Sequence, residues 1–184
     1  MICESIIEAV VSEMLACFKE SDGFFSKTRD MFATRTQSYI LETKKYLEAA
    51  IFGEIGNNTF DHNFGFESNY PWGAYCNLSY KQKYIVLADY GRGIRQSLLP
   101  VLTSIGSDRE AIETAFTKRI SGRSPEQRGN GLKFVSDAIQ QNNWHLFFQS
   151  GTGSCSIDES GIKFLERPIP LTGCLAILDF SEGS

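Results

Sequence analysis

The sequence predicts an α+β domain in which helices cover one face of a mixed, mostly antiparallel sheet. Apolar residues recur at helical spacing in the first third of the chain. Short apolar runs separated by turn residues follow, as is typical of strands. The order is helices, two strands, a long loop, a helix and three or four further strands, and this order favours a two-layer sandwich.

The composition limits the class of protein. The 184 residues, 42% hydrophobic and 22% charged, fit one domain with a sizeable core. A net charge of -4 argues against a nucleic-acid binder that works through a general basic field. Five cysteines without a CxxC pair argue against a disulfide framework or a zinc site. Neither a signal peptide nor a membrane span is recognisable, so we expect a soluble, cytoplasmic protein.

Two helical regions open the chain. An amphipathic helix is predicted for residues 3–19, and a second helical region runs from about 29 to 63, where glycines and Pro71 break it. We therefore expect an N-terminal helix and linker, residues 1–28, followed by one domain, residues 29–184. The apolar side of the first helix could pack on the domain, which is the commoner outcome, or pair two subunits in a homodimer.

Strands dominate the rest of the chain. The runs AYCNLSY and KYIVLADY are expected to pair antiparallel through a turn at Lys81 and Gln82. Residues 91–130 are mostly polar, with one short helix behind a capping box of Ser107 and Glu110. So long a loop indicates a functional lid. A helix over about 131–141, a strand WHLFFQS, a hairpin SCSIDESGIKFLE and a strand GCLAILDF complete the prediction.

A polar stripe on the second helical region could carry chemistry. Glu54, Asn58 and His62 are four residues apart and share one side of a helix, with Asp61 beside them. One interpretation is a solvated helix face. The other is a site with a carboxylate able to take a proton and an amide oxygen able to ligate Mg²⁺.

Two glycine-containing segments raise a similar choice. Asp89 ends an apolar strand and is followed by Gly91 and Gly93, which is either a simple turn or a carboxylate that accepts a hydrogen bond from the amino group of a base. The stretch RGNG, residues 128–131, directly precedes a helix. It is either a plain loop-to-helix junction or a set of backbone amides offered to a phosphate.

In this order and spacing, the three segments resemble the motifs of the GHKL ATPase superfamily. That group unites DNA gyrase, heat-shock chaperones of the ninety-kilodalton class, histidine kinases and mismatch-repair ATPases. The resemblance covers roughly residues 40–180 and implies a Bergerat-type fold. It also implies ATP and Mg²⁺ as ligands, with residues 94–128 as the ATP lid.

The resemblance implies roles for individual residues. Glu54 matches the general base of hydrolysing members, Asn58 the asparagine that holds Mg²⁺, and Asp89 the aspartate that reads the adenine amino group. Cys174 stands where the superfamily often has threonine, which puts a hydroxyl contact near the adenine in doubt. The further ATP-binding positions that the resemblance implies are Asp61, His62, Gly91, Gly93, Ile94, Lys118, Arg128, Gly129, Asn130, Gly131, Leu132 and Cys174.

Among the members, the chain most resembles stand-alone bacterial ATP-binding proteins of the histidine-kinase or anti-sigma-factor-kinase type. It has no histidine before His62, so a complete histidine autokinase is not expected. Two functions stay open. One is a Mg-ATP-dependent ATPase or protein kinase in bacterial signalling, with Glu54 as base and Arg128 on the γ-phosphate. The other is a non-catalytic nucleotide-sensing module that closes its lid on a protein partner.

Overall fold

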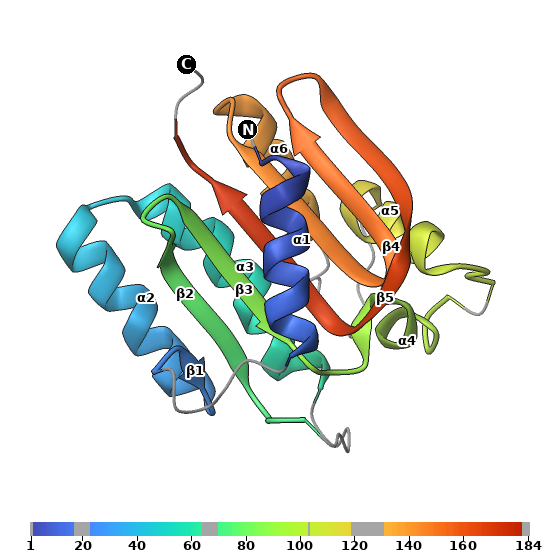
Figure 1. The fold of residues 1–184 in the computed structure, drawn as a ribbon, viewed down its shortest axis with the longest axis horizontal. Helices are drawn as coiled ribbons and strands as arrows, with labels where there is room; N and C mark the ends of the chain where they lie inside the picture. The colour runs from blue at the N-terminus through green and yellow to red at the C-terminus, as the bar shows by residue number, and fades with distance from the viewer. Residues whose placement is uncertain (1, 17–22, 64–69, 103, 119–130, 182–184) are drawn as a thin grey trace.

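A five-stranded sheet forms the centre of the molecule, with strand order β1-β2-β3-β5-β4 (Figure 1). The fold is known from a computed structural model that describes residues 2–16, 23–63, 70–102, 104–118 and 131–181. All strand pairs within these residues are antiparallel. The α+β class predicted from the sequence is therefore confirmed.

The strands differ greatly in length. Their bounds are β1 (Phe25–Ser26), β2 (Ala74–Tyr80), β3 (Tyr84–Asp89), β4 (His145–Asp158) and β5 (Gly161–Asp179). β2 and β3 pair as predicted, and Lys81 and Gln82 in their turn have φ values of 48° and 58°. The strands and hairpin predicted after residue 143 were wrong in two respects. β5 runs without a break through the second strand of the predicted hairpin and the predicted last strand. β4 continues past Ser150 along β5, because the ladder resumes after a register shift between Ser150 and Gly153.

Six helices lie within the described residues. They are α1 (Glu4–Leu15), α2 (Arg29–Thr43), α3 (Tyr46–His62), α4 (Gly93–Leu98), α5 (Asp108–Thr117) and α6 (Gly131–Gln141). The helical region predicted as continuous from 29 to 63 is divided at Lys44, which adopts a left-handed conformation with φ 61°. The short helix α4 was not predicted. None of the helices in the described ranges is long and apolar enough to cross a membrane.

The larger part of the core lies between the sheet and the helices α3, α5 and α6. Phe52 of α3, Phe116 of α5 and Ile139 of α6 are fully buried there, as is Phe148 of β4. α2 packs onto α3 through Phe32, whose ring lies so close to Gly56 that a Cβ there would sit 2.1 Å from it. This packing leaves α3 with one side against the sheet, which is where the candidate site is found.

The opposite face of the sheet is covered by α1, which lies in front of the sheet in Figure 1. Val10 and Met14 are buried against Val86 of β3 and Ile177 of β5. The hydroxyl of Tyr90 also donates a hydrogen bond to the backbone carbonyl of Met14 at 2.8 Å. Helices therefore lie on both faces of the sheet, rather than on one, and the apolar side of α1 is used within its own chain.

Candidate functional site

A narrow pocket lies between α3, the strands β3 and β5, and the start of α4. Its volume is about 30 Å³. The walls are largely apolar, and the polar side chains come mainly from α3 and from the ends of the strands. The lining residues are Ile55, Gly56, Asn58, Thr59, His62, Asn63, Ala74, Leu87, Ala88, Asp89, Gly93, Ile94, Ser97, Phe148, Cys174 and Ala176.

Asp89 is the buried carboxylate of this pocket, with 7% of its surface exposed. Its Oδ1 accepts hydrogen bonds from the Gly91 backbone at 2.7 Å and from Asn63 Nδ2 at 3.2 Å, and its Oδ2 accepts one from Thr59 Oγ1 at 3.2 Å. Burial raises the pKa of the Asp89 carboxyl above its ordinary value, although these bonds and one from the backbone of Cys174 act in the opposite direction. The carboxylate is thus fixed before any ligand arrives.

The last turn of α3 and the residue that follows it supply two side chains that the sequence motifs did not indicate. Thr59 and Asn63 are 5% and 4% exposed and hold the two oxygens of Asp89. They follow Asn58 and His62 by one residue each and repeat the same four-residue spacing. That second stripe is the signal that could have identified them, because both stripes belong to the side of α3 that faces β3.

Glycines let the backbone close tightly around Asp89. A Cβ on Gly91 would lie 1.9 Å from the side chain of Asn63. Gly173 has φ 81°, and a Cβ there would lie 2.0 Å from the Asp89 carbonyl oxygen. Gly93 has φ 73° and faces the Ser150 hydroxyl. A side chain at Gly91 or Gly93 would collide with Asn63 or Ser150, and one at Gly173 with the backbone of Asp89, so the pocket depends on glycine.

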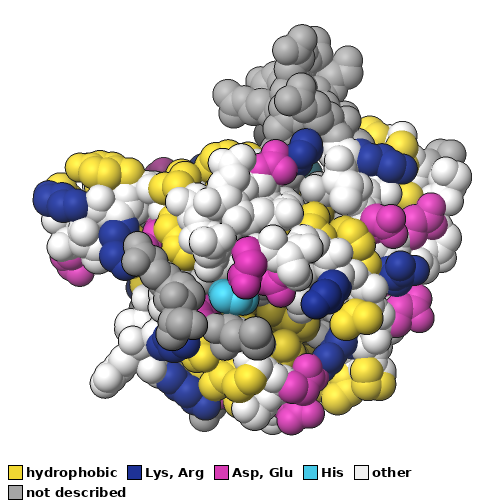
Figure 2. Space-filling view, turned by 90° about the horizontal axis from the view of Figure 1, so that it is seen from above, with side chains coloured by type: hydrophobic (Ala, Val, Ile, Leu, Met, Phe, Trp, Pro, Cys, Tyr) yellow, Lys and Arg dark blue, Asp and Glu magenta, His cyan; other side chains and the backbone are white. Residues whose placement is uncertain are grey.

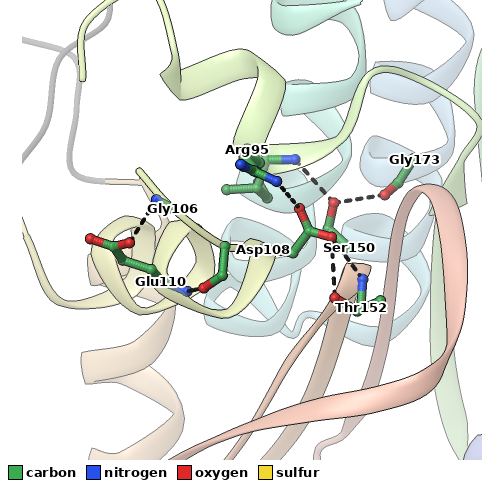
Figure 3. A network of polar contacts seen from close by, with 9 residues as sticks. Arg95, Gly106, Asp108, Glu110, Ser150, Thr152 and Gly173 are labelled. Carbon is green, nitrogen blue, oxygen red and sulfur yellow. Dashed lines mark hydrogen bonds and ion pairs between the residues drawn. The ribbon is translucent and has the colours of Figure 1, made fainter. Parts of the chain in front are cut away.

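Ser150 joins the pocket loop to the sheet and was also missed from the sequence. Its hydroxyl donates to the Gly173 carbonyl at 2.8 Å and accepts from the backbone N–H of Ile94 at 3.0 Å (Figure 3). Ser150 is 3% exposed. The start of α4, which forms one wall of the pocket, is therefore tied to β4 and β5 by one hydroxyl group.

The segment predicted as a lid is partly docked on the sheet. The Asp108 carboxylate, at the start of α5, accepts hydrogen bonds from the backbone and hydroxyl of Thr152 and lies 4.0 Å from Arg95 Nη1 (Figure 3). Ala111, Ile112 and the other inward residues of α5 are buried. Residues 103 and 119–128 of the predicted lid lie outside the described residues.

The other residues proposed from the resemblance are distributed as follows. Asn58, His62, Ile94 and Cys174 line the pocket with Asp89 and Gly93. Glu54 is exposed, and its Oε2 would be 2.5 Å from a Cβ on Gly131, so this carboxylate lies against the first residue of α6.

Besides Glu54, Gly91 and Gly131, three predicted residues within the described ranges do not line the pocket. Asp61 forms an ion pair with Arg29 on the outer side of α3. Leu132 is buried in the main core, and Lys118 is exposed at the end of α5. Arg128, Gly129 and Asn130 lie outside the described residues.

Cys174 brings a thiol to the pocket. It lies opposite Asp89 in the β3–β5 ladder and carries no disulfide. Burial raises the pKa of this thiol well above its ordinary value, and the neighbouring Asp89 carboxylate acts in the same direction. Because the thiolate is the reactive form, this cysteine is an unreactive, weakly polar wall of the pocket.

The site fits a hard cation only if a ligand supplies most of the coordination. Within the described residues, no group of three or more His, Cys, Asp or Glu side chains is arranged to hold a metal ion. Mg²⁺ commonly takes one or two protein oxygens together with phosphate oxygens and water. The amide of Asn58, beside the pocket and one turn from Glu54, is suited to that limited role.

On the face seen in Figure 2, Lys and Arg side chains are interspersed with Asp, Glu and apolar side chains and do not form one continuous basic field. This pattern agrees with the net charge of -4.

Comparisons with known proteins give a structural match. No family model matches the chain, and no curated protein matches it. Among solved structures, the chain is similar to the 43K ATPase domain of Thermus thermophilus gyrase B, solved in complex with an aminocoumarin. The two are 18% identical with a TM-score of 0.40, and the match covers 70% of this chain but only 32% of that one.

Proposed function

We propose that this chain binds ATP together with Mg²⁺ in the pocket between α3 and the sheet. The observation that carries the proposal is Asp89, a buried carboxylate held at the floor of an apolar pocket. A carboxylate in that setting selects a ligand that presents a hydrogen-bond donor from a flat apolar group. The amino group of adenine is such a donor, and Leu87, Ile94 and Phe148 offer apolar surface to its ring.

Base binding requires the pocket to widen. The present volume of about 30 Å³ is far below the roughly 300 Å³ at the lower end of small-molecule sites. Asp89 already accepts hydrogen bonds at both oxygens, so the incoming amino group must displace one of them. The Thr59 hydroxyl is the contact that can turn away at least cost, because it is a rotor that can bond elsewhere.

The phosphates would extend from the pocket towards the start of α6. Backbone amides of residues 129–131 and the helix N-terminus would receive them. Asn58 would hold the Mg²⁺ ion, which supplies charge neutralisation between the phosphates. Glu54, one turn before Asn58 and against Gly131, would accept the proton of a water molecule attacking the γ-phosphate.

Within that chemistry, we propose an ATPase or protein kinase in bacterial signalling, acting on a protein substrate in the cytoplasm. Glu54 supports catalysis, because a carboxylate beside the phosphate end has no evident role in binding an anion. The alternative is a nucleotide-sensing module that binds ATP and a protein partner with negligible turnover. The exposure of Glu54 favours this alternative, since a general base works best when it is held in place.

Calorimetric titration with Mg-ATP, paired with thermal unfolding, tests the proposal. The parent chain should bind, and ligand at about 100 times its dissociation constant should add roughly 2.7 kcal/mol, or about 5–10 °C. Asp89→Asn should lose binding, because its amide presents a donor to the adenine amino group.

Asp179→Asn is the matched control, since Asp179 is also a buried carboxylate at a strand end, but it lies opposite His145 in the β4–β5 ladder and does not line the pocket. A parent chain that does not bind, or an Asp89→Asn variant that binds as well as Asp179→Asn, would reject the proposed site.

A further inference from the structure

Asn63, the residue that follows α3, bridges two parts of the pocket. Its Nδ2 donates a hydrogen bond to Asp89 Oδ1 at 3.2 Å, and its Oδ1 accepts one from the backbone N–H of Arg92 at 3.0 Å. With 4% of its surface exposed, the side chain has little alternative to these contacts. One amide thus connects the carboxylate to the backbone three residues further along.

The chemistry of the two partners fixes the orientation of this amide. The Asp89 carboxylate only accepts hydrogen bonds, and the Arg92 N–H only donates one. If the Asn63 amide were turned over, its oxygen would face the carboxylate and its NH₂ group would face the N–H, so both contacts would become repulsive. Asn63 therefore distinguishes its two neighbours and holds them in a defined arrangement.

The glycine segment packs directly on the same amide. A Cβ on Gly91 would be 1.9 Å from Asn63 Nδ2 and 2.1 Å from Oδ1. Gly91 also donates its backbone N–H to Asp89 Oδ1 at 2.7 Å. Asp89, Gly91 and Arg92 are thus gathered around one side chain, so the shape of this turn depends on Asn63 as well as on its own glycines.

We infer that Asn63 is a positioning residue for the nucleotide, acting through Asp89. The inference rests on the proposed function and adds to it. Asn63 aims the carboxylate that reads the base, and it connects this end of the site to α3, the helix that carries Asn58 and Glu54 at the phosphate end. A shift of α3 would then change the contacts of the nucleotide at both its base end and its phosphate end.

Replacement of Asn63 by Asp gives a test that a merely structural role would not pass. The new carboxylate would face Asp89 at hydrogen-bond distance, and of two such carboxyl groups one takes up a proton far more readily than usual. Once protonated, the introduced group again offers a donor to Asp89 and an acceptor to Arg92. Binding lost at pH 8 should therefore return at pH 5.5.

Asn57→Asp is the matched control. Asn57 precedes Asn58 on the same helix and does not line the pocket, so its replacement adds the same charge to α3. The other titratable groups beside Asp89, His62 on α3 and Cys174 on β5, are common to both variants, as is ATP itself. The ratio of the two Mg-ATP dissociation constants at each pH isolates the contribution of residue 63.

We expect Asn63→Asp to bind Mg-ATP at least about tenfold more weakly than Asn57→Asp at pH 8, because a charge-assisted hydrogen bond is replaced by repulsion. At pH 5.5 the ratio should fall to within about threefold. A ratio near one at both pH values overturns the positioning role and leaves the proposed function intact, provided that Asp89→Asn still abolishes binding. A ratio that is still about tenfold at pH 5.5 also overturns the positioning role, because the loss of binding would then come from disturbed packing and not from the charge of residue 63.

Failure of the proposed function would look different. The parent chain would then not bind Mg-ATP at either pH, and the positioning role would be rejected with it. Thermal unfolding without nucleotide tests the hydrogen bonds of Asn63 separately from ATP binding. The bridge itself predicts that Asn63→Asp unfolds at a lower temperature than Asn57→Asp at pH 8, with a smaller difference at pH 5.5.

Discussion

The Asp108 carboxylate, at the first residue of α5, accepts a hydrogen bond from the backbone N–H of Thr152 at 2.9 Å. Thr152 lies between two glycines of β4, and a Cβ on either would be within 2.4 Å of Asp108. The Gly-Thr-Gly stretch of β4 is therefore a seat for the start of α5. This half of the predicted lid is part of the core, so nucleotide-dependent movement is not expected from α5.

Asp108→Ala should destabilise the chain by about 1–3 kcal/mol, because it leaves the Thr152 N–H without its charged partner. Glu113→Ala, at an exposed position of the same helix, is the control and should change stability by less than about 0.5 kcal/mol. Urea denaturation measures both. Equal effects would mean that the carboxylate does not hold α5 on β4.

Gly173→Ala should destabilise the chain and weaken nucleotide binding together, because the new Cβ would collide with the Asp89 carbonyl. Gly23→Ala is the control, since Gly23 has a similar φ of 72° but open space around it. The control should cost only the roughly 1–2 kcal/mol of a left-handed alanine. Urea denaturation and Mg-ATP titration of both variants separate the backbone strain, which both share, from the collision, which only Gly173→Ala has. Equal losses of stability in the two variants would refute the collision.

Glu54→Gln should keep Mg-ATP binding and remove any ATP hydrolysis, because the amide cannot accept the proton of the attacking water. The measurement is phosphate release under saturating ATP, with the dissociation constant measured in parallel. Glu42→Gln, at an exposed position of α2, serves as the control. If the parent hydrolyses ATP and Glu54→Gln does so at the same rate, Glu54 is not the base.

The buried Asp179 should make stability depend on pH through Lys83, which lies 3.2 Å away. Burial opposes the charge of Asp179, but hydrogen bonds from Ser181 and Lys83 prevail and lower the pKa of its carboxyl. Because the pKa of Asp179 is lower in the folded chain than the value of about 3.9 in the unfolded chain, its charged form stabilises the fold at pH values above about 3.9. This stabilisation is lost as the pH falls through the folded pKa.

Lys83→Met should therefore cost about 1 kcal/mol at pH 7 and less at pH 3, because the contribution of the ion pair decreases as pH falls towards the lowered pKa of Asp179. The comparison requires urea denaturation at the two pH values. Lys81→Met, in the same turn, should show no such dependence. A cost for Lys83→Met that is equal at pH 7 and pH 3 would contradict the ion pair.

The parts of the site that could be predicted are those whose residues lie within a few positions of one another in the sequence. The stripe Asn58 and His62 and the strand-end Asp89 followed by glycines are local patterns, and the pocket does contain them. The partners of Asp89 could not be predicted in this way. Thr59 and Asn63 are 30 and 26 residues from Asp89, and only the packing of α3 on β3 brings them together.

The misread elements have physical causes too. Gly151 and Gly153 interrupt the apolar pattern of β4 and so conceal its continuity, whereas in the structure they make room for Asp108. The break between α2 and α3 has neither glycine nor proline, since Lys44 itself takes the left-handed conformation. α1 was expected to pack on the domain or pair two chains, and periodicity alone could not decide that it covers the second face of the sheet.

The position of β5 within the sheet has a consequence for how the chain folds. β5, residues 161–179, lies between β3 and β4, although it is the last strand in the sequence. Until it is inserted, both neighbours present unpaired edges, which can pair with other chains. The pairing of β5 with β3 joins segments that are far apart in the sequence, and such pairing is slow compared with helix formation. A chain cut before residue 161 should therefore aggregate rather than form a smaller domain.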